Sequence, residues 1–184
     1  EYVFRNALTS DMQVAELVRI AMEEKGFKKF AILYPNDNYG IEYTNLFWDY
    51  ILARGGEIVA AQSYNTKETD FRSPMARLVG KYFLDDRLEE YKVLAKDWFL
   101  KQKYISSRIS PPDDLLKPIV KFDALFIPDS TRALGQIAPM LAYHDIKDTH
   151  LMGTNLWNTP SLLKRGQGFV EGAIFVDSLL AEDT

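Results

Sequence analysis

The sequence predicts an α/β fold: a three-layer, doubly wound parallel sheet of about five strands with helices on both faces. Two observations support this prediction. Short apolar segments of strand length alternate with longer segments whose apolar residues recur every three or four positions. The short segments are apolar at successive positions, as expected of parallel strands that helices cover on both faces. Parallel pairing requires crossover connections, and the intervening helices supply them.

The composition is that of one folded domain that buries a sizeable core. Of its 184 residues, 47% are hydrophobic and 26% are charged, which excludes a disordered chain. The formal net charge of −4 argues against nucleic acid or an anionic membrane as a partner. The absence of cysteine excludes disulfides, thiolate catalysis and cysteine-based zinc sites. No apolar run approaches the roughly 18 residues that span a bilayer.

The first elements are a helix and a strand. A helix is expected over 11–25, because its apolar residues recur at helical spacing. Ser10 can cap its N-terminus, and Gly26 stops it. A strand is expected over 30–34, where five apolar or aromatic residues follow one another before Pro35. This run therefore predicts a central strand of the sheet.

The next elements repeat this alternation. The loop 36–40 is rich in turn-forming residues, and a second helix over 41–53 follows it. The glycine pair 55–56 ends that helix, and 57–61 has the pattern of a second strand. Asp70 can cap a third helix, which continues to Val79.

The segment 81–118 interrupts the alternation. It is charged and has helical propensity as far as Tyr104, and it is loop-like through Ser106, Ser107, Pro111 and Pro112. We interpret it as an insertion that carries its own helix, not as a second domain. The whole chain is therefore expected to form a single α/β lobe.

The alternation resumes after this segment. The expected elements are a strand over 124–127, a helix over 131–143, a strand over 151–153, a short helix over 161–164 and a last strand over 172–176. Pro139 falls inside the first of these helices and should shorten or kink it, because proline removes a backbone donor and its ring clashes with the preceding turn.

The sequence lacks the motifs of common catalytic sites. No glycine-rich phosphate loop follows the first strand, and no serine lies in a nucleophile elbow. The acidic pairs 85–86 and 89–90 alternate with basic residues, which is typical of a solvated helix face. His144 and His150 flank one loop, and we interpret them as part of a polar connection, not a metal site. We therefore expect no catalytic residues, metal or cofactor.

Binding residues are expected beyond the carboxyl ends of the strands, where open parallel sheets hold their ligands. This rule selects the loops 35–40, 63–70, 128–131 and 153–157. Aromatic and short polar side chains in these loops, which also hold Tyr64 and Thr154, suit a small polar ligand. The candidate ligand-binding residues are Tyr39, Asp129, Ser130, Thr131, Asn155 and Trp157. For Tyr39 and Trp157 the alternative role is packing within the core.

Several short motifs occur in a characteristic order along the chain. They are FRN at 4–6, KKFAILY at 28–34, NDNYG at 36–40, GGEIV at 55–59, TDF at 69–71, FDALF at 122–126 and LMG at 151–153. Together they resemble the second lobe of type I periplasmic binding proteins of the branched-chain amino-acid receptor group. The resemblance covers nearly the whole chain except the segment 81–118.

This resemblance implies a function in binding, not catalysis. It implies the ligand-recognition lobe of a periplasmic solute-binding protein for amino acids, amides or related small polar ligands, which serves an ABC transporter or a sensor. In that family two lobes close on the ligand, and the chain crosses between them three times. We therefore expect this chain to lack the first lobe, to meet a membrane permease and to be periplasmic. Lipid anchoring through a missing N-terminus is one option.

The resemblance also implies particular contacts. Tyr39 matches the Tyr of the Tyr-Gly motif that contacts the ligand, and a second contact falls near Ser130 or Thr131. The third is an acidic residue that holds the ligand ammonium two positions after a strand glycine. Here Asn155 occupies that position, and an amide neutralises no charge. This departure counts against α-amino acids unless Asp129 replaces the missing carboxylate.

A second resemblance gives an alternative function. The sequences FIPD at 126–129 and GTNLWN at 153–158, together with Pro139, resemble the lipoprotein activators of penicillin-binding proteins. Those proteins use a similar two-lobe fold to contact cell-wall synthases. The alternative is therefore an envelope lipoprotein that binds and regulates a cell-wall synthase. In that case Trp98, Phe99 and Tyr104 would be anchors for the partner, unless they form a small local core.

Overall fold

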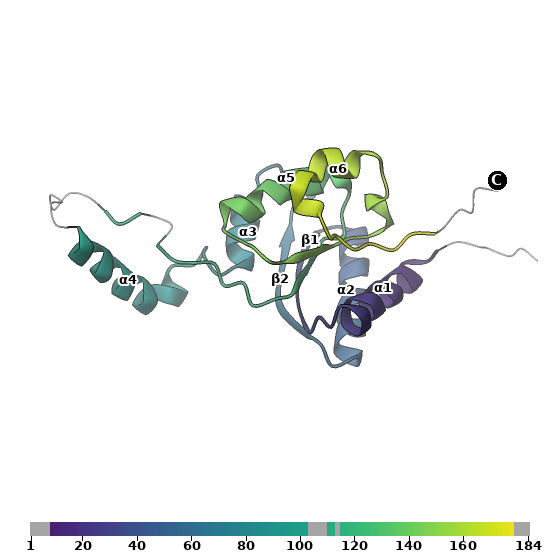
Figure 1. Cartoon of the computed structure of the whole chain (residues 1–184), viewed down its shortest axis with the longest axis horizontal. Coiled ribbons are helices and arrows are strands. Elements are labelled where there is room, and N and C mark those ends of the chain that lie inside the picture. Colours follow the sequence, from purple (N-terminus) through teal and green to yellow (C-terminus); the bar gives the residue numbers. More distant parts are fainter. Residues whose placement is uncertain (1–7, 103–109, 113–114, 179–184) are drawn as a thin grey trace, which may run out of the picture.

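The computed structural model of the chain describes residues 8–102, 110–112 and 115–178. It confirms an α/β architecture with a parallel sheet between two layers of helices (Figure 1). The strands are β1 (Lys29–Pro35), β2 (Glu57–Tyr64), β3 (Ala124–Phe126) and β4 (His150–Met152). The helices are α1 (Ser10–Arg19), α2 (Asn38–Ala53), α3 (Arg72–Leu78), α4 (Leu88–Lys101), α5 (Thr131–Tyr143) and α6 (Ser161–Gly166).

The strand order is β2-β1-β3-β4, with every neighbouring pair parallel. The connection through α2 leads from β1 outward to β2, whereas the connection through α5 leads from β3 outward to β4 on the other side. The direction of winding therefore reverses between β1 and β3. In open α/β sheets this reversal opens a crevice at the carboxyl ends of the two strands, which is the usual place for a ligand.

Successive residues of β1 show how the two helical layers cover the sheet. Phe30 and Ile32 face the layer of α1 and α2, and both are fully buried. Ala31 and Leu33 point to the other face, where α3 and α5 pack. Because strand side chains alternate between faces, a strand that is apolar at every position needs cover on both sides. The predicted central strand is therefore confirmed.

The boundaries of α1 and α2 differ from the expectation. Thr9, not Ser10, caps α1: its hydroxyl accepts the backbone N–H of Met12 at 3.2 Å. A π-helical turn continues α1 to Glu24, and Gly26, with a φ of 73°, ends it as predicted. The start of α2 lies three residues before the predicted start.

The early start of α2 has a clear local cause. The carboxylate of Asp37 accepts the backbone N–H of Gly40 at 2.7 Å and so caps the helix. Gly40 also packs against Pro35, where a Cβ atom would lie 2.1 Å from the proline carbonyl oxygen. Tyr39 therefore lies in the first turn of a helix and not in a loop, and this fixes the direction of its ring.

The second strand and third helix also shift. β2 extends three residues beyond the predicted end, as far as Tyr64, because it pairs with β1 along its whole length. Phe71 occupies the N-cap position of α3, so the prediction of Asp70 as the cap is wrong. The carboxylate of Asp70 accepts the backbone N–H and guanidinium of Arg72, and these bonds lower the pKa of Asp70 to about 2.

The predicted fifth strand is wrong. Residues 172–176 make only an isolated bridge, between Ile174 and Met152, so the sheet has four strands in the described part of the chain. The strands on this side of the sheet are short, since β3 and β4 have three residues each. Ile174 exchanges backbone hydrogen bonds with Leu151 and Gly153, and the short neighbour offers little more to pair with.

Pro139 does not shorten α5, which continues to Tyr143. The proline removes one backbone bond, to the carbonyl of Gly135. Ile137 and Ala138 are fully buried against the sheet, and this packing holds the helix together on either side of the missing bond. The predicted shortening is therefore wrong, because tertiary packing compensates for the lost hydrogen bond.

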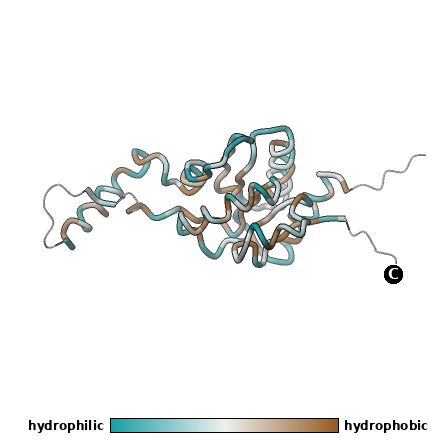
Figure 2. Tube along the Cα trace, turned by 90° about the horizontal axis from the view of Figure 1, so that it is seen from above, coloured by the Kyte–Doolittle hydropathy of each residue, from teal (hydrophilic) through white to brown (hydrophobic). Residues whose placement is uncertain are grey.

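The described part of the segment 81–118, which we call the arm, projects from the body (Figure 1). Its helix, α4, ends at Lys101; Tyr104, Ser106 and Ser107 lie outside the described residues. Hydrophobic residues occur along the arm as well as in the body (Figure 2). The interpretation of this segment as an insertion stays a prediction. None of the described helices is both long and apolar enough to cross a membrane.

Candidate functional site at the carboxyl edge of the sheet

The carboxyl ends of the four parallel strands meet at one edge of the sheet, and two tyrosine hydroxyls connect the segments that follow them. Tyr39 follows β1 and bonds to Thr154, which follows β4. Tyr64 ends β2 and bonds to Asp129, which follows β3. In the order β2-β1-β3-β4, each of these hydrogen bonds passes over one intervening strand. The edge is therefore held as a unit by contacts between residues distant in sequence.

Tyr39 is the first of these two connectors. Its hydroxyl donates to the Thr154 hydroxyl oxygen at 2.7 Å, and its ring lies 4.4 Å from that of Tyr43. Burial raises the pKa of Tyr39, so the phenol remains protonated and able to donate. The structure thus gives Tyr39 a packing role and places its side chain at the predicted edge.

Tyr64 is the second connector. Its hydroxyl donates to Oδ2 of Asp129 at 2.6 Å, while Oδ1 accepts the backbone N–H of Ser130 at 2.5 Å. Burial, followed by the nearby Asp129 charge, raises the pKa of Tyr64. The two bonds fix the direction of the carboxylate, and each oxygen keeps a further lone pair for a ligand.

Trp157 packs beneath the loops of this edge, in the interior of the protein. It is fully buried, and its indole N–H donates to the backbone carbonyl of Asp129 at 2.9 Å. Its ring packs on Gly153, where a Cβ atom would lie 2.1 Å from the indole. Trp157 therefore positions the loops after β3 and β4 and offers no accessible surface. The structure favours the alternative in which it packs in the core.

Thr131 also lies below the surface. It is buried at the start of α5, and its hydroxyl oxygen lies 3.2 Å from that of Ser161 at the start of α6. The hydroxyl of Thr159 donates to it at 3.4 Å. This small hydroxyl cluster joins the starts of two helices. Of the residues predicted after β3, it is thus Asp129 and Ser130 that border open space.

Asn155 begins a short 3-10 turn, Asn155–Trp157, after β4. Its backbone N–H donates to the side-chain oxygen of Gln13 at 3.1 Å, and Gln13 is buried on α1. The loop after β4 is thus tied to α1 as well as to Tyr39. The side chain of Asn155 is half-buried and carries no charge.

A cavity of about 450 Å³ lies between the end of β2 and the start of α5. Asp129 and Ser130 border it on one side, and the loop after Tyr64 borders it on the other. Its charged residues have both signs: Asp129 and Glu68 are acidic, whereas Lys67 and Arg132 are basic. The volume lies within the roughly 300–1,000 Å³ of small-molecule sites. The cavity suits a small ligand that carries charged or hydrogen-bonding groups.

Three residues of this edge were missing from the predicted set. Tyr64 and Thr154 lie in the expected loops but are not among the candidates, and Gln13 lies on α1, outside those loops. The polar residues 62–63 favour an earlier end of the strand, whereas pairing with β1 extends β2 to Tyr64. Gln13 precedes Val14 on the inner face of α1, and its position in that pattern could have indicated burial.

His144 is a titratable residue that does not border the cavity. It is buried at the end of α5, neither ring nitrogen has a hydrogen-bond partner among the described residues, and burial lowers its pKa. Such an environment favours the neutral imidazole. Across residues 8–102, 110–112 and 115–178, no group of three or more His, Asp or Glu side chains has the arrangement of a metal site.

The chain resembles proteins of one family in sequence and fold. Residues 1–81 match the sequence model of a family described as periplasmic binding protein. No curated protein sequence matches the chain. A type 1 periplasmic binding protein from Bordetella pertussis is 18% identical, with a TM-score of 0.58 over 91% of this chain and 34% of that one.

Two further solved structures contain ligands. A transporter solute-binding protein from R. palustris, in complex with 4-hydroxybenzoate, is 19% identical, with a TM-score of 0.55 over 86% of this chain and 33% of that one. The substrate-binding protein of a branched-chain amino acid transporter from Streptococcus pneumoniae, in complex with isoleucine, is 18% identical. Its TM-score is 0.54 over 90% of this chain and 36% of that one.

The chain spans about a third of the length of these structures, and each match includes most of the chain. At this level of identity the likeness establishes the fold. The same fold class was predicted from the alternation of strands and helices. The chain thus has the fold of a type I periplasmic binding protein lobe, and residues 1–81 carry the sequence pattern of the periplasmic binding protein family.

Proposed function

We propose that this chain is the ligand-recognition lobe of a periplasmic solute-binding protein, which binds a small organic ligand and presents it to an ABC transporter. The observation that supports this most directly is the carboxylate of Asp129, fixed by Tyr64 and Ser130 at the border of a cavity of about 450 Å³. This arrangement provides a preorganised acceptor for a ligand. We therefore propose binding and not catalysis.

The charges of the cavity favour a ligand with polar groups of both signs. Asp129 and Glu68 can accept hydrogen bonds from an ammonium or hydroxyl group, while Lys67 and Arg132 can bind a carboxylate. Isoleucine and 4-hydroxybenzoate, the ligands of two similar structures, are both small carboxylates. We therefore propose a small carboxylate as the ligand, either an amino acid or an aromatic acid.

Asp129 is the group that distinguishes these two ligand classes. Asn155 has no charge to offer an ammonium group, whereas Asp129 lies after the neighbouring strand with its carboxylate direction fixed. If the ligand is an amino acid, Asp129 holds its ammonium. A second lobe would close over this edge in the full-length protein, because one lobe supplies only one wall of a cleft. The proposed contacts on this lobe are Asp129 and Ser130, with Tyr39 and Asn155 beside them.

Calorimetry on the full-length protein tests this proposal. The panel contains amino acids, their amides and 4-hydroxybenzoate, and at least one member is expected to bind. Asp129→Asn keeps an oxygen for the Tyr64 hydroxyl but removes the charge. It should weaken an ammonium ligand at least about tenfold, because a hydrogen bond to a charged group contributes about 1.5–3 kcal/mol.

The matched control is Asp49→Asn, an exposed carboxylate on α2 that does not border the cavity. This change should leave the affinity within about twofold of the parent protein. Absence of binding by every member of the panel would contradict the proposed function. Equal loss with Asp129→Asn and Asp49→Asn would instead contradict the role of Asp129. Regulation of a cell-wall synthase, the alternative function, stays a prediction.

A further inference from the structure

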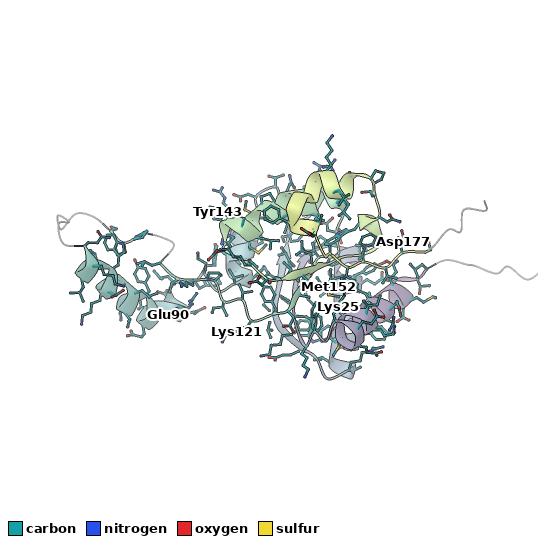
Figure 3. The ribbon with its side chains drawn as sticks, in the orientation of Figure 1. Lys25, Glu90, Lys121, Tyr143, Met152 and Asp177 are labelled. Carbon is teal, nitrogen blue, oxygen red and sulfur yellow. The ribbon has the colours of Figure 1, made fainter. Side chains whose placement is uncertain are left out.

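His144 lies where the end of α5 meets α3 and the start of the arm. It is the C-cap residue of α5, directly after Tyr143, and it is only 5% exposed. The backbone of Arg72, at the start of α3, and the side chain of Lys81, at the start of the arm, lie near enough to its imidazole to shift its pKa. Figure 3 shows Tyr143 on the side of the body from which the arm projects. His144 is therefore part of the contact among these three segments.

The imidazole of His144 is buried without a hydrogen bond. Neither Nδ1 nor Nε2 has a partner among the described residues. Most buried polar groups are hydrogen-bonded, so an unpaired one needs a physical explanation. Burying a neutral polar ring costs free energy, but burying a charged ring without a counter-charge costs far more. The end of α5 therefore tolerates the neutral imidazole and disfavours the imidazolium.

The groups around the ring strengthen this preference. Burial is the largest cause of the lowered pKa of His144, and the positive charge of Lys81 is the next, because it repels an imidazolium. The backbone of Arg72 raises the pKa, but by less, and the guanidinium of Arg72 is bound to Asp70. A helix C-terminus normally favours a charged histidine through the helix dipole. At His144, burial and Lys81 outweigh that effect.

No carboxylate of the described residues offsets the charge that a protonated His144 would carry. Asp145 follows it directly, but the Asp145 carboxylate is 64% exposed and pairs with Lys147. The bond to Lys147 is the main reason that the pKa of Asp145 is lowered, and the charges of Lys117 and Lys81 add to it. Lysines from both ends of the arm therefore lie on this side of the body, where a further positive charge is unfavourable.

We propose that His144 makes the contact between α5 and α3 sensitive to pH. With the ring neutral, the end of α5 stays packed; when the ring takes up a proton in mild acid, the buried charge loosens this contact and destabilises the lobe. The sign follows from proton linkage. The unfolded chain, in which histidine titrates near about pH 6.5, binds the proton more tightly than the folded lobe. The stabilisation is therefore complete above that pH and is lost as the pH falls through the lower pKa of the folded state.

Urea unfolding of the whole chain at about pH 7.5 and about pH 5 tests the proposal. His144→Gln cannot take up the proton, and the titration of the carboxylates is common to both proteins. Between these two pH values, the unfolding equilibrium constant should therefore rise at least about threefold more in the parent protein than in the variant. The upper limit is about thirtyfold, set by the unperturbed histidine pKa of about 6.5. In the background of Lys81→Met this difference should shrink, because the repelling cation is gone.

His144→Leu gives the same readout with an apolar side chain in this buried position, should the glutamine variant fail to fold. His150→Gln is the matched control, because His150, the other histidine of the chain, is exposed at the start of β4. It should keep the pH dependence of the parent protein. A pH dependence that the His144 variants leave unchanged, or that His150→Gln removes, would overturn the proposal. So would an NMR titration in which the His144 ring is half protonated at or above about pH 6.5.

Discussion

The carboxyl edge of the sheet and the arm both present aromatic and charged side chains, but different interactions hold them in place. At the edge, Tyr39, Tyr64 and Trp157 each bond to a residue more than 25 positions away. In the arm, α4 has no buried residue, and its ion pairs join residues three or four positions apart. Two long-range bonds join the outgoing and returning segments of the arm, which form its neck: Arg87 donates to the backbone carbonyl of Lys117, and the backbone N–H of Ile119 donates to the carbonyl of Val79.

This difference predicts which part of the molecule a substitution will destabilise. The edge is continuous with the core, so a change there should lower the free energy of unfolding of the whole lobe. The arm is joined to the body by a narrow neck, so a change there should open the arm and leave the body folded, as expected of a region with few buried contacts. Four substitutions test the comparison in order of decreasing effect.

Trp157→Ala should have the largest effect. It removes a fully buried side chain and leaves the carbonyl of Asp129 without its donor, so the free energy of unfolding should fall by about 3–5 kcal/mol. Urea unfolding followed by circular dichroism measures the loss. Leu163→Ala, at a 75% exposed position on α6, is the control and should change stability by less than about 0.5 kcal/mol. A loss below about 1 kcal/mol for Trp157→Ala would contradict this role.

Tyr64→Phe and Tyr39→Phe should have smaller and unequal effects. Tyr64→Phe removes a bond to a carboxylate, which contributes about 1.5–3 kcal/mol to stability. Tyr39→Phe removes a bond to a neutral hydroxyl, which contributes about 0.5–1.5 kcal/mol. Each substitution controls for the other, because both replace a tyrosine with phenylalanine at the same edge, although Tyr64 is buried and Tyr39 is half-buried. Equal losses of unfolding free energy in the two variants, measured by urea unfolding, would argue that the charge of Asp129 does not strengthen its hydrogen bond with Tyr64.

The order of the elements in the body could be predicted because it depends on local patterns. Apolar runs and helical spacing are properties of neighbouring residues, and they identified every strand from β1 to β4. The errors at the starts of α1, α2 and α3 had local causes, whereas the other errors occurred where distant residues decide the outcome. Pairing with β1 extends β2 to Tyr64, packing on the sheet preserves α5 at Pro139, and the short β4 leaves residues 172–176 with a single bridge.

The candidate site could be predicted to the level of loops but not of individual roles. The rule that ligands lie beyond the carboxyl ends of strands selected the segments that contain Asp129 and Ser130, which border the cavity. It could not separate exposed from buried residues within a loop. Trp157 and Thr131 proved to be buried, and the role of Tyr64 depends on a bond to a residue 65 positions away.

Arg87→Met should have the smallest effect on the stability of the whole lobe. Its effect should be confined to the arm. The substitution keeps much of the side-chain volume but removes the bonds to Gly80 and Lys117. The body should lose less than about 1 kcal/mol, since none of these partners belongs to its core. Limited digestion with chymotrypsin should instead cut the arm several times faster, because opening of the neck exposes its backbone.

The control for this last substitution is Arg54→Met, which removes an arginine from the body beside Tyr50 and leaves the neck intact. It should not change the rate of cleavage in the arm. If Arg87→Met leaves that rate unchanged, the guanidinium does not hold the neck, and the backbone bond between Ile119 and Val79 holds it instead. If cleavage spreads at once into the body, the arm and the lobe unfold as one unit. That result would remove the distinction between an edge held by distant contacts and an arm held by local ones.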